Sequence, residues 1–204
     1  MDKRIILGIS GNIGVGKTTI VEYLARYWDW AFYKEPVEEN PYLKLYYREP
    51  KRWGLHSQLY FLSNRFEEEL RLSRLGKSYI LDRTIYEDGE VFARIALEKE
   101  EYKTYLKLYR LALKYLPKPD LVVYLKAPID VLIERIRKRK REEEELISYD
   151  YIERLNNAYE EWLKGFKKAP VLIYNAEEDM VEKIGDLISL IEGYIKIIDR
   201  QILM

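Results

Sequence analysis

Residues 11–18 read Gly-Asn-Ile-Gly-Val-Gly-Lys-Thr and stand between an apolar run at residues 5–9 and a segment with helical apolar spacing at residues 20–24. This G-x-x-x-x-G-K-T pattern between a strand and a helix is typical of a phosphate loop. The glycines let backbone N–H groups surround a phosphate, Lys17 reaches the outer phosphates, and Thr18 can ligate Mg²⁺. The candidate nucleotide-binding residues are Gly11, Asn12, Ile13, Gly14, Val15, Gly16, Lys17, Thr18 and Thr19.

Five short apolar runs separated by helical-length segments predict the rest of the fold. They are continuous in apolar character, which is typical of parallel strands covered on both faces. We therefore expect fully buried strands at residues 4–10, 31–35, 78–82, 121–126 and 171–175. Apolar stripes at positions 55, 59, 62, 66 and 70, and at 184, 187, 188 and 191, indicate helices that pack through one face. The sequence predicts a single α/β domain over residues 1–204, with a five-stranded parallel sheet between two helical layers.

The composition excludes several classes of function. The chain has 35 basic and 35 acidic residues, so we expect neither nucleic acid nor an anionic membrane as partner. Cysteine is absent and His56 is the only histidine, which excludes thiol catalysis and Cys/His zinc sites, and a Ser-His-Asp triad unless His56 is its base. The apolar run at residues 5–9 is too short for a signal peptide or a membrane span, and we expect a cytoplasmic protein.

Two predicted strands end on a carboxylate, at the edge where parallel sheets bind their ligands. Asp82 closes the third strand and is a candidate for holding Mg²⁺, through water. Alternatively it caps the next helix, and the two roles are compatible. Glu35 closes the second strand, where a carboxylate near the γ-phosphate could accept the proton of an acceptor hydroxyl. The alternative for Glu35 is a solvated strand end.

Further motifs give the chain a family resemblance. Five segments occur in the same order in the deoxynucleoside kinases: Glu35-Pro-Val, Tyr47-Arg-Glu-Pro-Lys-Arg-Trp53, Gln58, Asp82-Arg-Thr-Ile-Tyr-Glu-Asp88 and Arg139-Lys-Arg-Glu-Glu-Glu144. From the phosphate loop to about Leu163 the chain resembles this family, and the bacterial deoxyadenosine/deoxyguanosine kinases in particular. The resemblance implies a P-loop kinase fold and phosphate transfer from ATP, with Mg²⁺, to the 5'-hydroxyl of a deoxynucleoside.

The same resemblance implies roles for individual residues. Glu35 would be the base that activates the 5'-hydroxyl, and Arg83 would hold that hydroxyl and the transferring phosphate. Tyr47 and Glu144 would bind the sugar 3'-hydroxyl, and Gln58 would make paired hydrogen bonds to the base.

Helical spacing extends the predicted base pocket. Gln58 and Arg65 are seven residues apart on one predicted helix, and Asp88 and Phe92 are four apart on the next, so both pairs can face one cleft. The alternative is a helix surface with solvated polar groups and a core Phe.

The resemblance also bears on the preferred base. Arg65 and Asp88 resemble the residue pair of family members that act on deoxyadenosine, deoxyguanosine or deoxycytidine. This resemblance disfavours thymidine as the substrate. The chain departs from the animal enzymes at two positions. Asn40 stands where they commonly have tryptophan, and Ser57 where they commonly have an aromatic residue.

The basic run after the fourth predicted strand is the candidate lid, at about residues 135–147. The family resemblance implies a lid that closes over the phosphates and supplies positive charge, with the arginines Arg135, Arg139 and Arg141. The alternative is a solvated basic helix, balanced by the acidic residues 142–145. The acidic block also argues against a nucleic-acid site, because it cancels most of the basic field. The family further implies a helix-mediated homodimer.

Two other functions remain open from the sequence. A thymidylate kinase would share the phosphate loop, the Asp-Arg dipeptide and a Glu-Pro pair, but its motif usually continues with glycine where Val37 stands. A nucleotide-dependent switch or ATPase would share the phosphate loop alone. The acceptor of the phosphate distinguishes these alternatives from a deoxynucleoside kinase.

Overall fold

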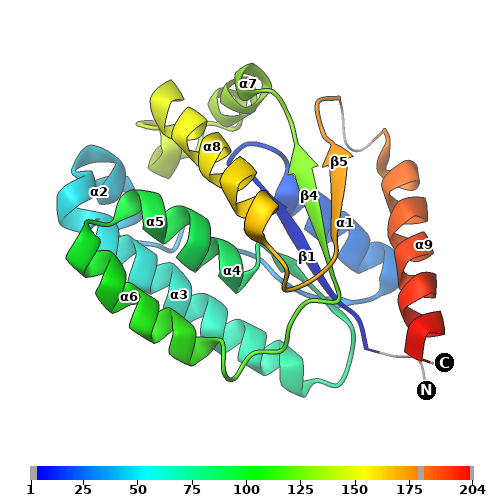
Figure 1. Cartoon of the computed structure of the whole chain (residues 1–204). Helices are drawn as coiled ribbons and strands as arrows, with labels where there is room; N and C mark the ends of the chain where they lie inside the picture. Colours follow the sequence, from blue (N-terminus) through cyan, green and yellow to red (C-terminus); the bar gives the residue numbers. More distant parts are fainter. Residues whose placement is uncertain (1–3, 179–181, 203–204) are drawn as a thin grey trace.

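The computed structural model describes residues 4–178 and 182–202, and it places a twisted sheet between two layers of helices (Figure 1). The described strands are all parallel and follow the order β2-β3-β1-β4-β5. Their bounds are β1 Ile6–Gly11, β2 Ala31–Tyr33, β3 Tyr79–Asp82, β4 Leu121–Lys126 and β5 Val171–Asn175. The predicted three-layer architecture is thus confirmed for these residues.

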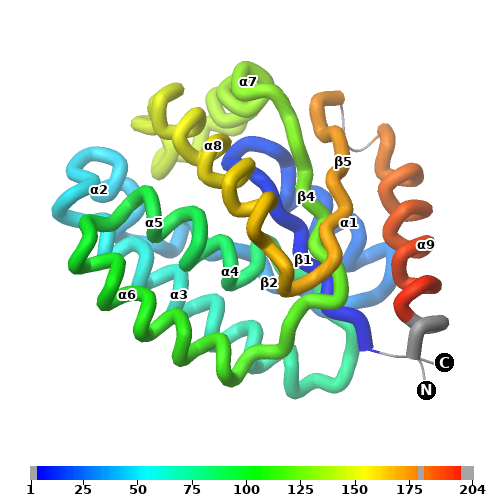
Figure 2. Tube along the Cα trace, in the orientation of Figure 1, coloured from blue at the N-terminus to red at the C-terminus, as the bar shows by residue number. Residues whose placement is uncertain are grey.

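The helices divide between the two faces of the sheet. In Figure 1, α1 and α9 cover one face, while α3, α4 and α8 cover the other, with α7 above the carboxyl ends of the strands. Figure 2 shows α6 running along the outside of α3, and α2 at the far end of that layer. The α-helices are α1 Lys17–Trp28, α2 Leu43–Arg48, α3 Pro50–Arg74, α4 Ile85–Glu87, α5 Ala93–Ala96, α6 Lys99–Ala112, α7 Ile129–Arg139, α8 Tyr149–Gly165 and α9 Ile184–Ile202.

Strand pairing brings the predicted functional segments to one edge. Ile9 of β1 is in register with Asp82 of β3, and Gly11 is in register with Leu125 of β4. The phosphate loop begins where β1 ends, at the centre of the sheet, so it lies beside the end of β3. This parallel arrangement places ligand-binding segments together at the carboxyl edge.

The prediction that all five strands are fully buried is correct only at the centre of the sheet. Every residue of β1 and β3 is buried, and β4 is buried except for Lys126. The outer strands β2 and β5 are only partly buried, with Ile173 of β5 60% exposed. Both are edge strands that pair on one side only, which leaves more of their surface open to solvent.

The two predicted apolar stripes also differ. In α9, Ile184, Leu187, Ile188 and Ile191 are all buried, as expected. In α3 the stripe at positions 55, 59, 62, 66 and 70 is buried only at Leu62, and its other members are half-buried. Three of these half-buried members, Leu59, Phe66 and Leu70, line a groove between α3 and α6.

The segment after β3 is not one regular helix. Between α4 and α5 the chain makes a π turn at Asp88–Phe92, in which the N–H of Ala93 donates to the carbonyl oxygen of Asp88. The predicted i, i+4 helical relation of Asp88 and Phe92 therefore does not hold, because the turn accommodates an additional residue.

Hydropathy gives one further observation. Among the described helices, none combines the length and the apolar character that a membrane span requires.

Candidate active site

The phosphate loop is closed by its own lysine in this structure. Lys17 donates to the carbonyl oxygens of Gly11 at 2.9 Å and Asn12 at 3.0 Å, which holds its ammonium group inside the loop. Gly14 has φ 86°, and a Cβ there would lie 2.6 Å from the carbonyl oxygen of Leu132, so only glycine fits. Among the loop residues, Ile13 and Gly14 line the pocket beside Lys17, whereas Val15 is buried in the core and Thr19 is exposed.

The loop is also anchored from the opposite helical layer. The side-chain amide of Asn12 donates to the carbonyl oxygen of Ile152 at 3.1 Å, and its own oxygen accepts from the N–H of Ile13 at 2.8 Å. Asn12 is buried, so both bonds are shielded from water. The phosphate loop therefore cannot shift without disturbing the start of α8.

Burial changes the protonation of the loop lysine. Desolvation lowers the pKa of Lys17 to about 8, Asp82 opposes this shift, and Arg83 reinforces it. A bound phosphate would favour the charged form, because an anion stabilises an ammonium group in a desolvated site.

Thr18 and Asp82, the two predicted magnesium residues, are brought together. The Thr18 hydroxyl donates to Oδ2 of Asp82 at 2.6 Å, and Oδ1 of Asp82 is buried with no hydrogen-bond partner among the described residues. A hydroxyl next to a carboxylate with a free oxygen fits Mg²⁺, which prefers oxygen ligands and retains several waters. The predicted pair thus offers oxygen donors of the kind that Mg²⁺ prefers.

Glu35 lies against two arginines from different elements. Its Oε1 accepts from Nη2 of Arg65 at 2.9 Å and also from Nη2 of Arg83. The predicted catalytic pair, Glu35 and Arg83, is therefore in direct contact, and both residues line the pocket that contains Lys17. Glu35 lies two residues beyond the end of β2, and its side chain is largely buried rather than a solvated strand end.

Arg83 has an unusual backbone and an incompletely satisfied side chain. Its φ is 67°, although it is not a glycine, and such strain in a buried residue persists only where the surroundings impose it. Its N–H donates to the carbonyl oxygen of Ile9, and its own carbonyl oxygen accepts from Nη1 of Arg65 at 2.7 Å. Its Nε and Nη1 are buried without a partner in the described part of the chain. A ligand in the adjoining pocket could supply the missing acceptors.

Aromatic rings determine where the Arg83 guanidinium lies. Its Cζ is 3.9 Å from the centroid of Phe92 and 5.9 Å from that of Phe61. Contact with a ring face attracts the cation and restricts its movement. Phe92, predicted for the base pocket, thus lines the pocket and also supports Arg83.

The pocket brings together most of the predicted substrate residues. Tyr47, Gln58, Phe92 and Glu144 line one cavity with Lys17 and Glu35. The sequence reasoning missed five further lining residues: Val37, Leu43, Tyr46, Phe61 and Tyr151. Phe61 could have been found, because it follows Gln58 by three positions on the same helix. No local signal links Tyr46 to Tyr151, whose rings are 6.0 Å apart although the residues lie in distant segments.

Arg65 and Asp88 lie next to this cavity rather than on its surface. Neither is among the described residues that line the pocket, and both are buried. Nε of Arg65 donates to Asp88 at 2.7 Å, and its remaining nitrogens bind Glu35 and the carbonyl oxygens of Asp82 and Arg83. The predicted position of Arg65 and Asp88 in the cleft does not match this placement. Arg65 is turned toward the ends of the strands instead.

The two positions that depart from the animal enzymes contact each other. The Asn40 amide donates to the hydroxyl oxygen of Ser57 at 3.3 Å, and both residues are buried. This pair fastens the segment before α2 to α3, close to Gln58.

The predicted lid separates into two parts. Arg139 and Arg141 line the pocket and contact Glu144, with Nε of Arg139 donating to it at 2.6 Å. Glu144 is buried on the 3₁₀ turn Glu142–Glu144. These residues meet at the pocket, and the basic run is therefore not simply a solvated helix.

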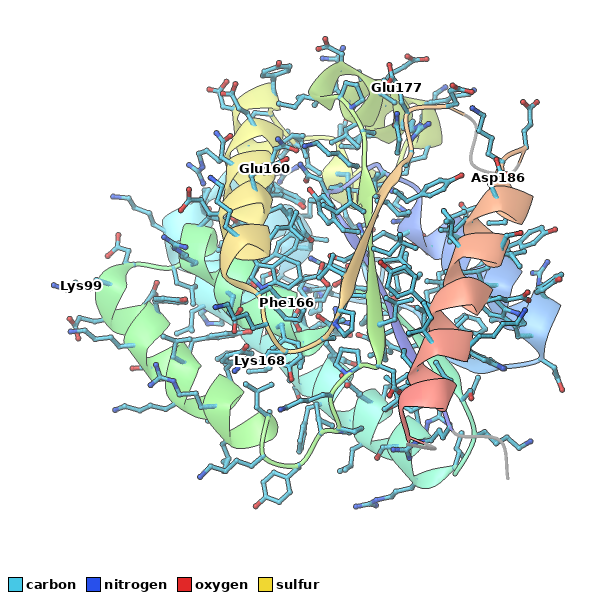
Figure 3. All side chains as sticks on the ribbon, turned by 45° about the vertical axis from the view of Figure 1, so that its right-hand side comes forward. Lys99, Glu160, Phe166, Lys168, Glu177 and Asp186 are labelled. Atoms are coloured by element: carbon cyan, nitrogen blue, oxygen red, sulfur yellow. The ribbon has the colours of Figure 1, made fainter. Side chains whose placement is uncertain are left out.

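Arg135 points in another direction. Its guanidinium donates to the carbonyl oxygens of Ala176 at 2.8 Å, Glu177 at 2.9 Å and Glu178 at 3.0 Å. Figure 3 shows Glu177 beside α7, on the loop that follows β5. Arg135 in this structure joins α7 to that loop, and the prediction that it lies over the phosphates does not match its position.

Comparisons with known proteins give a consistent result. A family model described as deoxynucleoside kinase matches residues 7–198. The chain is 35% identical to the deoxyadenosine/deoxycytidine kinase of Bacillus subtilis, covering 92% of this chain and 93% of that protein. It is 34% identical to the deoxyguanosine kinase of the same organism, with 83% of each chain covered.

Solved structures agree with the sequence relatives. A structure of deoxyadenosine kinase from M. mycoides with the products dCMP and a flexible dCDP bound has a TM-score of 0.82 and 31% sequence identity. It covers 93% of this chain and 100% of that chain. A structure of the same enzyme with dATP bound has a TM-score of 0.79 and the same coverage.

Proposed function

Because this chain belongs to the deoxynucleoside kinase family, we propose that it transfers the γ-phosphate of ATP to the 5'-hydroxyl of deoxyadenosine and deoxyguanosine, with deoxycytidine as a further acceptor. One observation supports the proposal most directly. The base candidate Glu35, the cation Arg83 and the phosphate-loop Lys17 line a single pocket together with Gln58 and other nucleoside-binding candidates. Donor and acceptor groups can therefore meet in one cavity.

The proposed transfer uses positioning and charge more than covalent chemistry. Glu35 accepts the proton of the 5'-hydroxyl, while Arg83 holds that hydroxyl and the transferring phosphate with its free Nε and Nη1. Lys17 binds the outer phosphates in place of the two carbonyl oxygens that it contacts in this structure. Arg139 and Arg141 add charge from the lid. In-line attack then needs only the alignment of the two substrates.

The proposed metal site consists of Thr18 and Asp82. When bound there, Mg²⁺ would neutralise charge on the phosphates of ATP. Thr18 supplies its hydroxyl oxygen, and Asp82 supplies its unpartnered Oδ1 or orients water toward the ion.

The acceptor lies in the other half of the pocket. Tyr47 and Glu144 bind the sugar 3'-hydroxyl, Gln58 binds the base edge, and Phe92 contacts the ring. Arg65 and Asp88 lie outside the cavity and are bound to each other, and Arg65 also donates to Glu35. A nucleoside monophosphate would need a further positive site for its own phosphate, which Tyr47, Gln58 and Glu144 do not provide, and this favours a nucleoside as acceptor.

A homodimer is part of the proposal, through the outer faces of α3 and α6. A groove between these helices is lined by Leu59, Phe66 and Leu70 from α3 and by Leu108 and Leu111 from α6. Leu108 and Leu111 are 47% and 51% exposed. Contiguous exposed apolar surface of this kind favours association. Light scattering after size-exclusion chromatography should give a dimer at micromolar concentration, and Leu111→Glu should give a monomer. A wild-type protein that is a monomer at this concentration would contradict the proposed homodimer.

The function is tested by measuring phosphate transfer from Mg-ATP to deoxyadenosine, deoxyguanosine, deoxycytidine, thymidine and thymidine monophosphate, with a control that lacks acceptor. Transfer to the deoxynucleosides, led by a purine, is the expected result. Transfer only to the monophosphate would indicate thymidylate kinase, and hydrolysis without acceptor would indicate an ATPase or switch. Glu35→Gln should bind nucleoside normally and lose most of its turnover, whereas full turnover would exclude Glu35 as the base.

A further inference from the structure

The π turn at Asp88–Phe92 carries two side chains that the catalytic residues depend on. Phe92 lies against the guanidinium of Arg83 at 3.9 Å, and Asp88 accepts from Nε of Arg65, which in turn binds Glu35. A small rotation of this turn would therefore move both arginines relative to Glu35. π turns are rare and are frequently found at functional sites. The turn requires support from outside itself.

That support comes from two other helices and converges on Glu90, at the middle of the turn. The hydroxyl of Tyr109 on α6 donates to Oε1 of Glu90 at 2.9 Å. The indole Nε1 of Trp162 on α8 donates to Oε2 of the same carboxylate, also at 2.9 Å. Each oxygen of Glu90 thus has its own donor, and the two donors come from α6 and α8, which both pack against the turn.

The backbone of the turn is fixed at the neighbouring residue. The hydroxyl of Tyr102 on α6 donates to the carbonyl oxygen of Gly89 at 3.0 Å. The ring of Tyr109 packs directly on Gly89, where a Cβ would come within 2.7 Å of the ring carbons. Glycine at this position allows the ring to approach closely enough for its hydroxyl to reach Glu90.

We propose that Glu90, Tyr109 and Trp162 form a clamp that sets the rotation of the π turn, and so act as positioning residues for Phe92 and the Arg83 guanidinium. The inference rests on the proposed function, because it concerns the nucleoside half of the same pocket. None of the three clamp residues lines that pocket among the described residues. The clamp therefore acts through Phe92 and Asp88, and the ATP half of the site should not depend on it.

Tyr109→Phe tests the clamp while keeping the ring that packs on Gly89. Tyr105→Phe is the matched control, because Tyr105 lies on the same helix, is buried, and has a hydroxyl with no hydrogen-bond partner in the described part of the chain. We expect Tyr109→Phe to lower kcat/KM for the deoxynucleoside about tenfold, as the loss of a hydrogen bond to a charged group predicts. The Kd for ATP should stay within about twofold of wild type, and Tyr105→Phe should leave both quantities unchanged.

A second measurement does not depend on catalysis. Hydrogen–deuterium exchange of the peptide covering residues 85–96 should be faster in Tyr109→Phe than in wild type, and unchanged in Tyr105→Phe. Trp162→Phe should produce the same local change by removing the second donor. Equal exchange in Tyr109→Phe and wild type, or kinetics that match those of Tyr105→Phe, would overturn the clamp. If the wild-type protein transfers no phosphate to any deoxynucleoside, the proposed function fails, and the exchange measurement alone decides the clamp.

Discussion

Replacing Arg65 with methionine should both destabilise the fold and damage the catalytic pair. Arg65 has no exposed surface and binds Asp88 at 2.7 Å and Glu35 at 2.9 Å. It also binds the carbonyl oxygens of Asp82 and Arg83. Methionine fills a similar volume but supplies no donor. The substitution therefore leaves buried carboxylates and backbone carbonyls without their partner.

The size of the effect follows from the buried ion pair. Removing one member of such a pair costs about 3–5 kcal/mol, because the other charge remains desolvated. Asp88 has 3% of its side chain exposed and cannot recover its hydration. We expect the free energy of unfolding to fall by about this amount. We also expect kcat to fall at least ~10-fold, because Arg65 no longer donates to the carbonyl oxygen of Arg83, whose backbone conformation is strained.

Urea denaturation followed by circular dichroism measures the stability, and transfer to deoxyadenosine measures kcat. Arg71→Met is the control on the same helix, since Arg71 is exposed and pairs only with Glu68 within the described contacts. Arg71→Met should lower the free energy of unfolding by less than about 0.5 kcal/mol. The double variant Arg65→Met with Asp88→Asn should be more stable than the sum of the single changes by about 1 kcal/mol or more, since the unpaired charge is removed. If Arg65→Met costs no more than Arg71→Met, the reasoning is refuted.

The remaining predictions concern the nucleotide half of the site. Burial lowers the pKa of Lys17 to about 8, and the cation is the form that binds phosphate, so binding is full below pH 8 and is lost above it. Titration calorimetry should show the Kd for ATP rising about tenfold between pH 7 and pH 9, and a flat profile would contradict this. Asp82→Asn keeps an acceptor for Thr18 but removes the charge, so the Mg²⁺ concentration for half-maximal activity should rise at least ~10-fold, and no change would exclude Asp82 from the metal site. Arg135 lies outside the pocket and binds three carbonyl oxygens of the loop after β5, so Arg135→Ala should lower the free energy of unfolding by about 1–3 kcal/mol and leave KM for ATP within about twofold of wild type. A severalfold rise in KM for ATP with unchanged stability would contradict this placement.

The sequence predicted the parts of the site that depend on local chain order. A phosphate loop must follow the strand that precedes it, and a carboxylate that closes a parallel strand must lie at the same edge. Strand register then determines the pairing of Thr18 with Asp82, which the structure shows at 2.6 Å. Lys17 and Glu35 reach one pocket for the same reason.

The sequence could not predict features that depend on the rotation of helices. Spacing alone placed Arg65 in the cleft, but α3 is oriented so that Arg65 points to the ends of β3 and toward Glu35. The π turn changes the phase of the chain between Asp88 and Phe92, and no propensity scale signals a single additional residue. Arg135 and Arg139 are the same residue type on the same helix, yet Arg135 binds the loop after β5 and Arg139 binds Glu144. Only packing distinguishes these positions.

The distribution of partners around Arg83 explains why so many buried charges gather at one strand end. Glu35 occupies Nη2 of Arg83, and Arg65 binds both Glu35 and the Arg83 carbonyl oxygen, so the guanidinium is fixed on one side only. On the other side Nε and Nη1 have no partner among the described residues, and Phe92 restricts their direction. A buried unsatisfied donor is costly in a finished core, and it is useful where a ligand will supply the missing acceptor. The positive φ of Arg83 supports the same proposal, because strained backbone conformations cluster at functional sites. In the proposed mechanism, Arg65 thus holds the carboxylate in place, and the free donors of Arg83 would bind the phosphate.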